Sequence, residues 1–243
     1  MIFDVVMILL LFFLYGQRRI GGWARGESVK QTVSNQEKLD LIHQNPDNEN
    51  IDSKEAEYER KKIALTFDDG PHYAYTKILL DGLKERGVVA TFFVTGEHAA
   101  LHPDLVLRMH NEGHLVGNHT YSHIALCHDN REEYKEELLL TSEVLEEITG
   151  EEVLFVRPPY GSWDKAFEEE LNMIPVLWTV DPLDWCSSSV ECIVQNTLCD
   201  VRENDIILMH DYFETSVTAA LEIVDELLED GFMLVTVDEI LFD

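Results

Sequence analysis

The sequence predicts an α/β domain whose parallel strands form a distorted (β/α) barrel of about seven strands. From residue 61 to residue 243, short apolar runs alternate with longer amphipathic ones, which is typical of βα units that build a parallel sheet. None of the apolar runs leads into a glycine-rich nucleotide loop, and this favours a barrel over an open sheet. About 180 residues are enough for one domain with a single core.

The elements follow from the hydrophobic pattern. Seven apolar runs are candidate strands: residues 63–67, 89–94, 115–118, 154–157, 175–179, 206–209 and 233–235. Six amphipathic runs are candidate helices: residues 75–86, 103–112, 132–149, 164–171, 190–200 and 215–229. Gly87 and Gly150 directly follow two of these helices, as C-terminal caps do. Functional residues are expected at the carboxyl ends of the strands.

Residues 1–23 are predicted to form an N-terminal membrane anchor or signal segment. Residues 5–15 are apolar without interruption, which is shorter than the roughly 20 residues of a spanning helix. No small-x-small cleavage site follows clearly, so an uncleaved anchor is favoured over a removed signal peptide. Arg18, Arg19 and Arg25 favour a cytoplasmic C-terminal flank, which conflicts with an extracellular domain unless a basic segment precedes Met1.

Residues 24–60 are polar and are predicted to be a linker ahead of a domain at 61–243. The chain has 18 Lys and Arg against 47 Asp and Glu, a formal net charge of −29, which argues against a nucleic-acid partner bound through its phosphates. The cysteines form no Cys-x-x-Cys pair, which argues against zinc-finger and thioredoxin-type sites. A disulfide among Cys186, Cys192 and Cys199 is left open.

Two acids end the first predicted strand. Asp68 and Asp69 stand before Gly70 and Pro71, which permit the strand to break so that the carboxylates take different positions. A solvated turn is the alternative, because Asp-Gly is common in turns.

Two histidines follow the third predicted strand. His119 and His123 are four residues apart, and in a helical turn this spacing places both imidazoles on one face, close enough for one cation. Combined with a carboxylate from Asp68 or Asp69, they make a two-histidine, one-carboxylate metal site. A chance pair among ten histidines is the alternative.

Three further strand ends carry polar groups. The stiff turn at residues 157–161 could direct backbone N–H groups at an oxyanion, and the loop at residues 181–185 combines acids with a tryptophan suited to a sugar face. His210 is a titratable group at the sixth strand end. The alternatives are an ordinary rigid loop for residues 157–161, a surface loop for residues 181–185 and a core histidine for His210.

Together these segments resemble the motifs of polysaccharide deacetylases of carbohydrate esterase family 4, the NodB-homology group. Five segments match in order, across most of residues 61–210: Thr66-Phe67-Asp68-Asp69-Gly70-Pro71, His119-Thr120-Tyr121-Ser122-His123, Arg157-Pro158-Pro159-Tyr160-Gly161, residues 181–185, and Leu208-Met209-His210. The resemblance implies a distorted NodB-homology barrel that removes the N-acetyl group from a hexosamine in a polymer with one divalent cation.

The resemblance also implies roles for the metal and the base. Asp69, His119 and His123 would be the metal ligands, and Asp68 would be the general base. Zn²⁺ is the expected ion, with Co²⁺, Ni²⁺ or Mn²⁺ as alternatives that this ligand set would accept.

The remaining roles concern the acid and the groove. By the same resemblance His210 would be the general acid, oriented by Asp184, while Arg157 would hold the base. The backbone N–H of Tyr160 would complete the oxyanion site, and Trp185 would form part of the groove wall.

The expected substrate is N-acetylglucosamine in peptidoglycan, acted on by a monomer anchored at the cell membrane with its catalytic domain extracellular, or secreted. Chitooligosaccharide, exopolysaccharide and acetylxylan are alternatives within the same chemistry. A catalytically silent glycan-binding envelope protein and a cytoplasmic hydrolase of small amides are alternatives of other classes. An intact base and acid at Asp68 and His210 argue against the silent protein.

Overall fold

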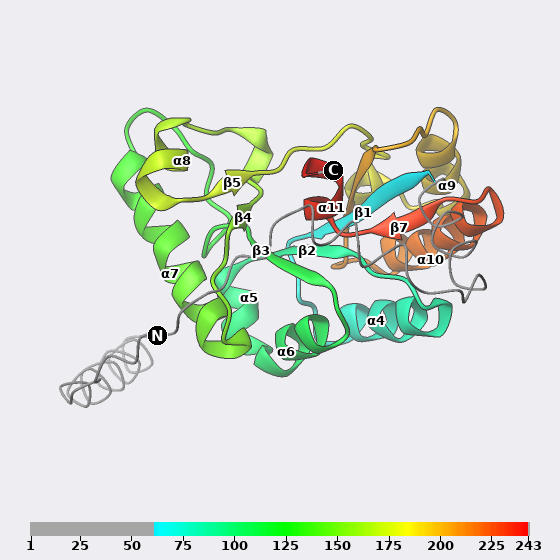
Figure 1. Cartoon of the computed structure of the whole chain (residues 1–243), viewed down its shortest axis with the longest axis horizontal. Helices are drawn as coiled ribbons and strands as arrows, with labels where there is room; N and C mark the ends of the chain where they lie inside the picture. The colour runs from blue at the N-terminus through cyan, green and yellow to red at the C-terminus, as the bar shows by residue number, and fades with distance from the viewer. Residues whose placement is uncertain (1–60, 243) are drawn as a thin grey trace, which may run out of the picture. The chain divides into compact units, whose positions relative to one another are not determined.

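A sheet of seven parallel strands forms the centre of the domain in the computed structural model, which describes residues 61–242 (Figure 1). The strands are β1 (Lys62–Asp68), β2 (Thr91–Val94), β3 (Leu115–Asn118), β4 (Phe155–Val156), β5 (Ile174–Pro175), β6 (Ile206–His210) and β7 (Met233–Val235). The main order is β5-β4-β3-β2-β1-β6. β7 pairs with the beginning of β1, on the side where β2 pairs with its end.

The sheet curves as a half-barrel. The edge strand β6, at the opposite end of the strand order from β5, pairs with the segment that follows β5, where the N–H of Leu208 donates to the carbonyl of Val180 at 2.9 Å. This short bridge joins the two edges of the curved sheet. The strand order confirms the predicted number of seven parallel strands.

The fifth predicted strand, 175–179, is wrong in its length, because β5 contains only Ile174 and Pro175. The carbonyls of the next two residues, Val176 and Leu177, accept hydrogen bonds from the Arg157 side chain. The buried guanidinium of Arg157 thus bonds the backbone directly after β5.

All six predicted helices are present, some with ends moved by one or two residues, and two short helices had no signal in the pattern. The helices are α4 (Tyr75–Arg86), α5 (Gly96–Leu101), α6 (Pro103–Asn111), α7 (Arg131–Thr149), α8 (Ala166–Leu171), α9 (Val190–Leu198), α10 (Glu214–Glu229) and α11 (Val237–Leu241), with 3₁₀ turns η1 (Pro159–Gly161) and η2 (Asp184–Cys186). α5 and α11 have six and five residues, too few for a helical period to show.

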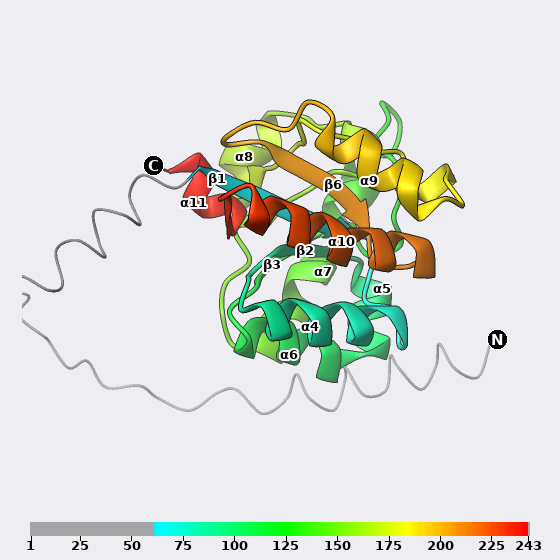
Figure 2. The ribbon, with the colours of Figure 1, turned by 90° about the vertical axis from the view of Figure 1, so that its right-hand side faces the viewer.

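The longer helices cover the outer face of the sheet. α9, α10, α4, α6 and α7 pack side by side in that order, and α9, α10, α4 and α6 are seen in Figure 2. Ile63, Leu65 and Phe67 of β1 are buried in the core between sheet and helices. The alternate residues of β1 face the inside of the half-barrel, where Ala64 joins a smaller cluster with Val237 of α11.

The membrane segment predicted at 1–23 and the linker predicted at 24–60 lie outside the described residues. Within residues 61–242, no helix is long and apolar enough to cross a membrane. Cys186, Cys192 and Cys199 are exposed and carry free thiols, so no disulfide joins them.

Candidate active site

The two acids lie where β1 ends. Asp68 is the last residue of the strand and is 3% exposed. Asp69 has a φ of 72°, a left-handed conformation that ends the strand at this residue. Both carboxylates consequently approach the same imidazole: Oδ2 of Asp68 is 3.8 Å and Oδ1 of Asp69 is 3.4 Å from Nε2 of His119.

His119 and His123 lie together, but the predicted helical turn is wrong. Residues 119–123 form an irregular loop in which Thr120 and His123 have φ values of 61° and 58°. Nε2 of His123 is 3.3 Å from Oδ1 of Asp69. The Nδ1–H of His119 donates to the carbonyl of Arg157 at 2.6 Å, which leaves the Nε2 lone pair free for a ligand.

These residues fit a divalent cation. Ligand atoms of Asp69, His119 and His123 lie within 4.8 Å of one another. Oδ1 of Asp69 is buried and has no hydrogen-bond partner among the described residues, and a cation would satisfy it. Burial alone would raise the pKa of Asp69, but the nearby imidazoles of His119, His123 and His210 lower it to about 2, so the carboxylate is ionised at neutral pH. Burial lowers the pKa of His123 and favours the neutral form that binds metals.

Arg157 holds Asp68 from the inside of the half-barrel. Its side chain is fully buried, and Nη1 donates to Oδ1 of Asp68 at 2.8 Å and to Oγ1 of Thr66 at 2.6 Å. The guanidinium lies over the ring of Phe93, 4.3 Å from its centroid. These bonds fix the orientation of the Asp68 carboxylate.

His210 and Asp184 form a buried pair beside Asp68. β6 runs next to β1 with His210 in register with Asp68. Asp184 accepts from the backbone N–H of His210 at 2.8 Å and from its Nδ1 at 2.9 Å. Burial alone would lower the pKa of His210, but the Asp184 carboxylate, together with Asp68 and Asp69, raises it to about 9. The imidazole is therefore protonated at neutral pH and can donate a proton from Nε2.

A pocket of about 340 Å³ joins these groups. Its lining residues are Asp68, Asp69, His119, His123, Pro158, Tyr160, Trp178, Asp181, Trp185, Leu208 and His210. Seven of the nine predicted site residues are in this lining, while Arg157 and Asp184 lie behind it as the partners of Asp68 and His210. Tyr160 and Trp185 are 74% and 56% exposed, as expected of groups that contact a large ligand.

The pattern missed two residues that shape the site. Trp178 lines the pocket from a segment predicted as strand, and a Cβ atom at the position of Gly161 would contact its ring. His98 of α5 lies with Nδ1 2.7 Å from the carbonyl of Asp69 and holds the loop that follows β1. Neither residue belongs to a motif, and only the folded chain brings them to the strand ends.

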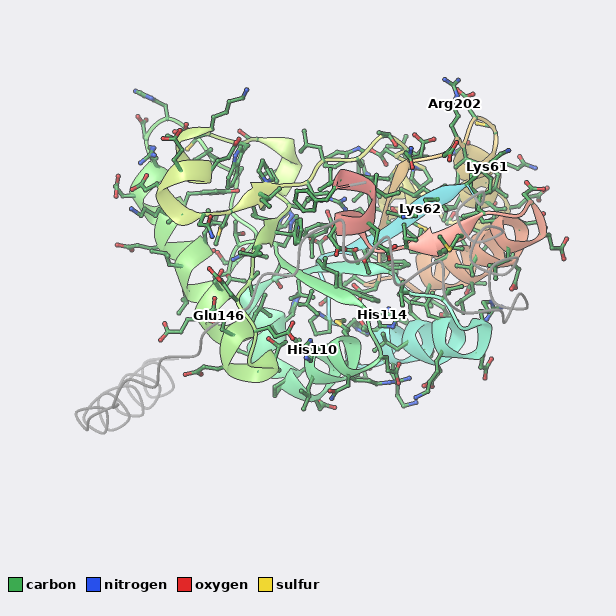
Figure 3. All side chains as sticks on the ribbon, viewed as in Figure 1. Lys61, Lys62, His110, His114, Glu146 and Arg202 are labelled. Atoms are coloured by element: carbon green, nitrogen blue, oxygen red, sulfur yellow. The ribbon has the colours of Figure 1, made fainter. Side chains whose placement is uncertain are left out.

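A second hollow, of about 220 Å³, lies between the end of α6, β3 and the end of α7. His110 and His114 line it and are labelled in Figure 3. His114 accepts from the N–H of Ala90 at 3.1 Å, and burial lowers its pKa to about 4, so it is an uncharged core histidine. This hollow holds none of the predicted site residues.

Comparison with known proteins gives a consistent result. Residues 55–176 match the family model described as polysaccharide deacetylase. The chain is 39% identical over 186 residues to a peptidoglycan-N-acetylglucosamine deacetylase of Bacillus cereus, covering 74% of this chain and 68% of the relative. It is also 39% identical over 181 residues to the peptidoglycan-N-acetylmuramic acid deacetylase PdaC of Bacillus subtilis, covering 74% of this chain but only 39% of that protein.

The fold agrees with that relationship. The solved structure of the peptidoglycan deacetylase PdaC from Bacillus subtilis superposes with a TM-score of 0.72 at 39% identity, over 75% of this chain and 90% of that one.

Proposed function

Because this chain belongs to the polysaccharide deacetylase family, carbohydrate esterase family 4, we propose that it hydrolyses the N-acetyl group of N-acetylglucosamine in peptidoglycan. One observation carries the proposal: a buried carboxylate and a protonated imidazole, Asp68 and His210, lie side by side on β1 and β6 next to a possible metal site. Amide hydrolysis needs a base for the attacking water and an acid for the leaving amine.

Asp68 is the proposed general base. It accepts a proton from water as the water oxygen bonds to the acetyl carbon, and the hydrogen bond from Arg157 keeps the carboxylate aimed at the pocket. A divalent cation held by Asp69, His119 and His123 would polarise the amide carbonyl and lower the pKa of the attacking water, and Zn²⁺ suits this ligand set, as do Co²⁺, Ni²⁺ and Mn²⁺.

His210 is the proposed general acid. Its Nε2 proton passes to the amine nitrogen as the carbon–nitrogen bond breaks, which yields acetate and a glucosamine residue. Asp184 keeps the imidazole protonated and correctly oriented through Nδ1. The N–H of Tyr160 would donate to the oxyanion, and the indole of Trp185 would contact the sugar.

The choice of sugar rests on the relatives. The Bacillus cereus relative supports N-acetylglucosamine, and the equally identical PdaC supports N-acetylmuramic acid as a second candidate. Because peptidoglycan lies outside the cell membrane, we propose an extracellular catalytic domain, anchored by the N-terminal segment or secreted, that acts as a monomer.

Acetate release by the purified protein, from N-acetylglucosamine pentamer and from peptidoglycan, tests the proposal. We expect release that stops with a chelator and returns with added Zn²⁺. Asp68→Asn should abolish turnover while metal binding, measured separately, is retained. Absence of acetate from both substrates with the metal bound would refute the proposal and favour a silent glycan-binding protein.

A further inference from the structure

A second group of aromatic side chains lies at the same edge of the sheet, outside the lining of the catalytic pocket. We call it the aromatic platform, and its members are His72, Tyr73, His98, Tyr212 and Phe213. Tyr73 is 69% exposed, and Tyr212 and Phe213 are 37% and 40% exposed. Exposed aromatic side chains gathered in one place are typical of a ligand-binding surface.

Three separate segments build the platform, and Tyr212 joins them. Its ring lies at 5.3 Å and nearly parallel to that of His98, and edge-on to that of His72 at 4.9 Å. Phe213 and Tyr73 extend the group on either side, against Tyr212 and His72 respectively. The rings hold one another in place, so a ligand would meet a surface that is already formed.

The platform also offers one donor and one acceptor. Nδ1 of His72 accepts from the N–H groups of Ala74 and Tyr75, so the proton of the neutral imidazole is on Nε2. Nδ1 of His98 donates to the carbonyl of Asp69, so its Nε2 carries a lone pair. Neither Nε2 atom has a hydrogen-bond partner within residues 61–242.

The platform is continuous with the catalytic centre. His98 contacts the backbone of the proposed metal ligand Asp69, and Tyr212 is two residues beyond the proposed acid His210. A polymer whose reacting residue lies in the pocket must continue across the neighbouring surface. The platform is the exposed aromatic part of that surface contributed by the loops after β1 and β6.

We propose that the aromatic platform binds a second sugar residue of the same glycan strand, next to the residue that is deacetylated. Aromatic rings pack against the apolar face of a pyranose, and the Nε2 atoms of His72 and His98 match the acceptor and donor of its hydroxyl groups. A neutral glycan also needs no basic partner, which suits a chain of net charge −29. The inference rests on the proposed function, because it extends the same substrate.

Binding of N-acetylglucosamine oligomers to the full chain tests the inference without turnover when Asp68→Asn is present. In that background Tyr73→Ala with Tyr212→Ala should weaken binding of the pentamer about tenfold and leave binding of the N-acetylglucosamine monomer, which occupies the pocket alone, unchanged. Tyr73→Ala alone, at a largely exposed position, should weaken pentamer binding severalfold even if the double variant folds poorly. Phe242→Ala removes an aromatic ring that is 67% exposed outside the platform and is the matched control, with no expected effect.

In the active protein the same substitutions should raise KM for the pentamer and leave kcat unchanged. Equal pentamer affinity in the parent and both tyrosine variants would overturn the inference, and acetate release by the parent would then leave the proposed function standing. Equal loss of monomer and pentamer affinity would also overturn it, because the substitutions would then act on the catalytic pocket itself. If the parent releases no acetate, the proposed function fails, yet weaker pentamer binding by the variants would still support a glycan site on the platform.

Discussion

Asp184→Asn should remove the positive charge of His210 at neutral pH. The Asp184 carboxylate accepts both the backbone N–H and the Nδ1–H of His210, and it is itself 1% exposed. Asparagine has nearly the same shape and keeps an oxygen acceptor, but it removes the negative charge that opposes the effect of burial on the imidazole.

The magnitude follows from the pKa of His210. Its rise from 6.5 to about 9 is equivalent to about 3 kcal/mol in favour of the imidazolium. Without the Asp184 carboxylate, burial is opposed only by the charges of Asp68 and Asp69, so the pKa should fall from about 9 toward 6.5. At a pKa of 6.5, about a tenth of the protein would be protonated at pH 7.5, so the protonated fraction and kcat/KM should both fall toward about a tenth of their values in the parent.

Two measurements check this prediction. An NMR titration of the imidazole resonances in chelator-treated protein gives the pKa of His210 directly, without the additional charge of a metal. Thermal unfolding gives the linked stability: because the folded pKa is raised, His210 stabilises the parent fully below pH 6.5, and this contribution is lost as the pH rises through about 9. Asp184→Asn should therefore be less stable than the parent mainly below pH 9, where the parent gains from the raised pKa of His210.

Asp181→Asn is the matched control, because Asp181 lies in the same loop and lines the same pocket but bonds the N–H of Leu183. The reasoning is refuted if His210 titrates at the same pH in Asp184→Asn as in the parent. The reasoning also fails if Asp181→Asn lowers the pKa of His210 as far as Asp184→Asn does.

Three further predictions concern stability. Burial raises the pKa of Asp211 to about 7, so the stability that its protonated form contributes is fully present below pH 3.8 and is lost as the pH rises through 7. Asp211→Asn keeps the shape of the side chain that bonds Thr76, and at pH 8 it should unfold at a higher temperature than the parent. A lower unfolding temperature would contradict this prediction. Arg157→Lys cannot reproduce the separate guanidinium bonds to Asp68, Val176 and Leu177 and should cost about 3 kcal/mol in urea unfolding and most of the activity, whereas an unchanged midpoint would mean that these bonds are dispensable. Ser189→Ala removes the side-chain cap of α9 and should cost about 1 kcal/mol without changing KM, as urea unfolding and acetate assays can measure.

Local patterns in the sequence were sufficient for most of the fold. The helix at Tyr75–Arg86 and the strand at Leu115–Asn118 are found at their predicted bounds, because hydrophobic periodicity and the cap at Gly87 are properties of a few neighbouring residues. The candidate site was also accessible from the sequence, since parallel strands bring their carboxyl ends together wherever the motifs occur in the chain.

What could not be predicted depends on contacts between distant segments. The fifth strand ends at Pro175, and the carbonyls of Val176 and Leu177 bond the Arg157 side chain; periodicity carries no information about such a bond. The helical turn expected for the histidine pair is replaced by a loop with positive φ at Thr120 and His123. The aromatic platform is assembled from loops that follow different strands, so no single stretch of sequence contains it.

Arg157 contributes to the catalytic centre through its side chain and through its backbone, and a substitution can remove only the side-chain contribution. Its guanidinium bonds the carboxylate of Asp68, whereas its backbone carbonyl bonds the imidazole of His119. The proposed base and one proposed metal ligand are thus attached to the same residue, and a shift of β4 would carry both together. A substitution at this position removes only the first attachment, because every amino acid supplies the carbonyl. The orientation of the proposed base and the position of the proposed ligand His119 can therefore be altered separately by mutation, while in the intact protein one backbone unit keeps their spacing constant.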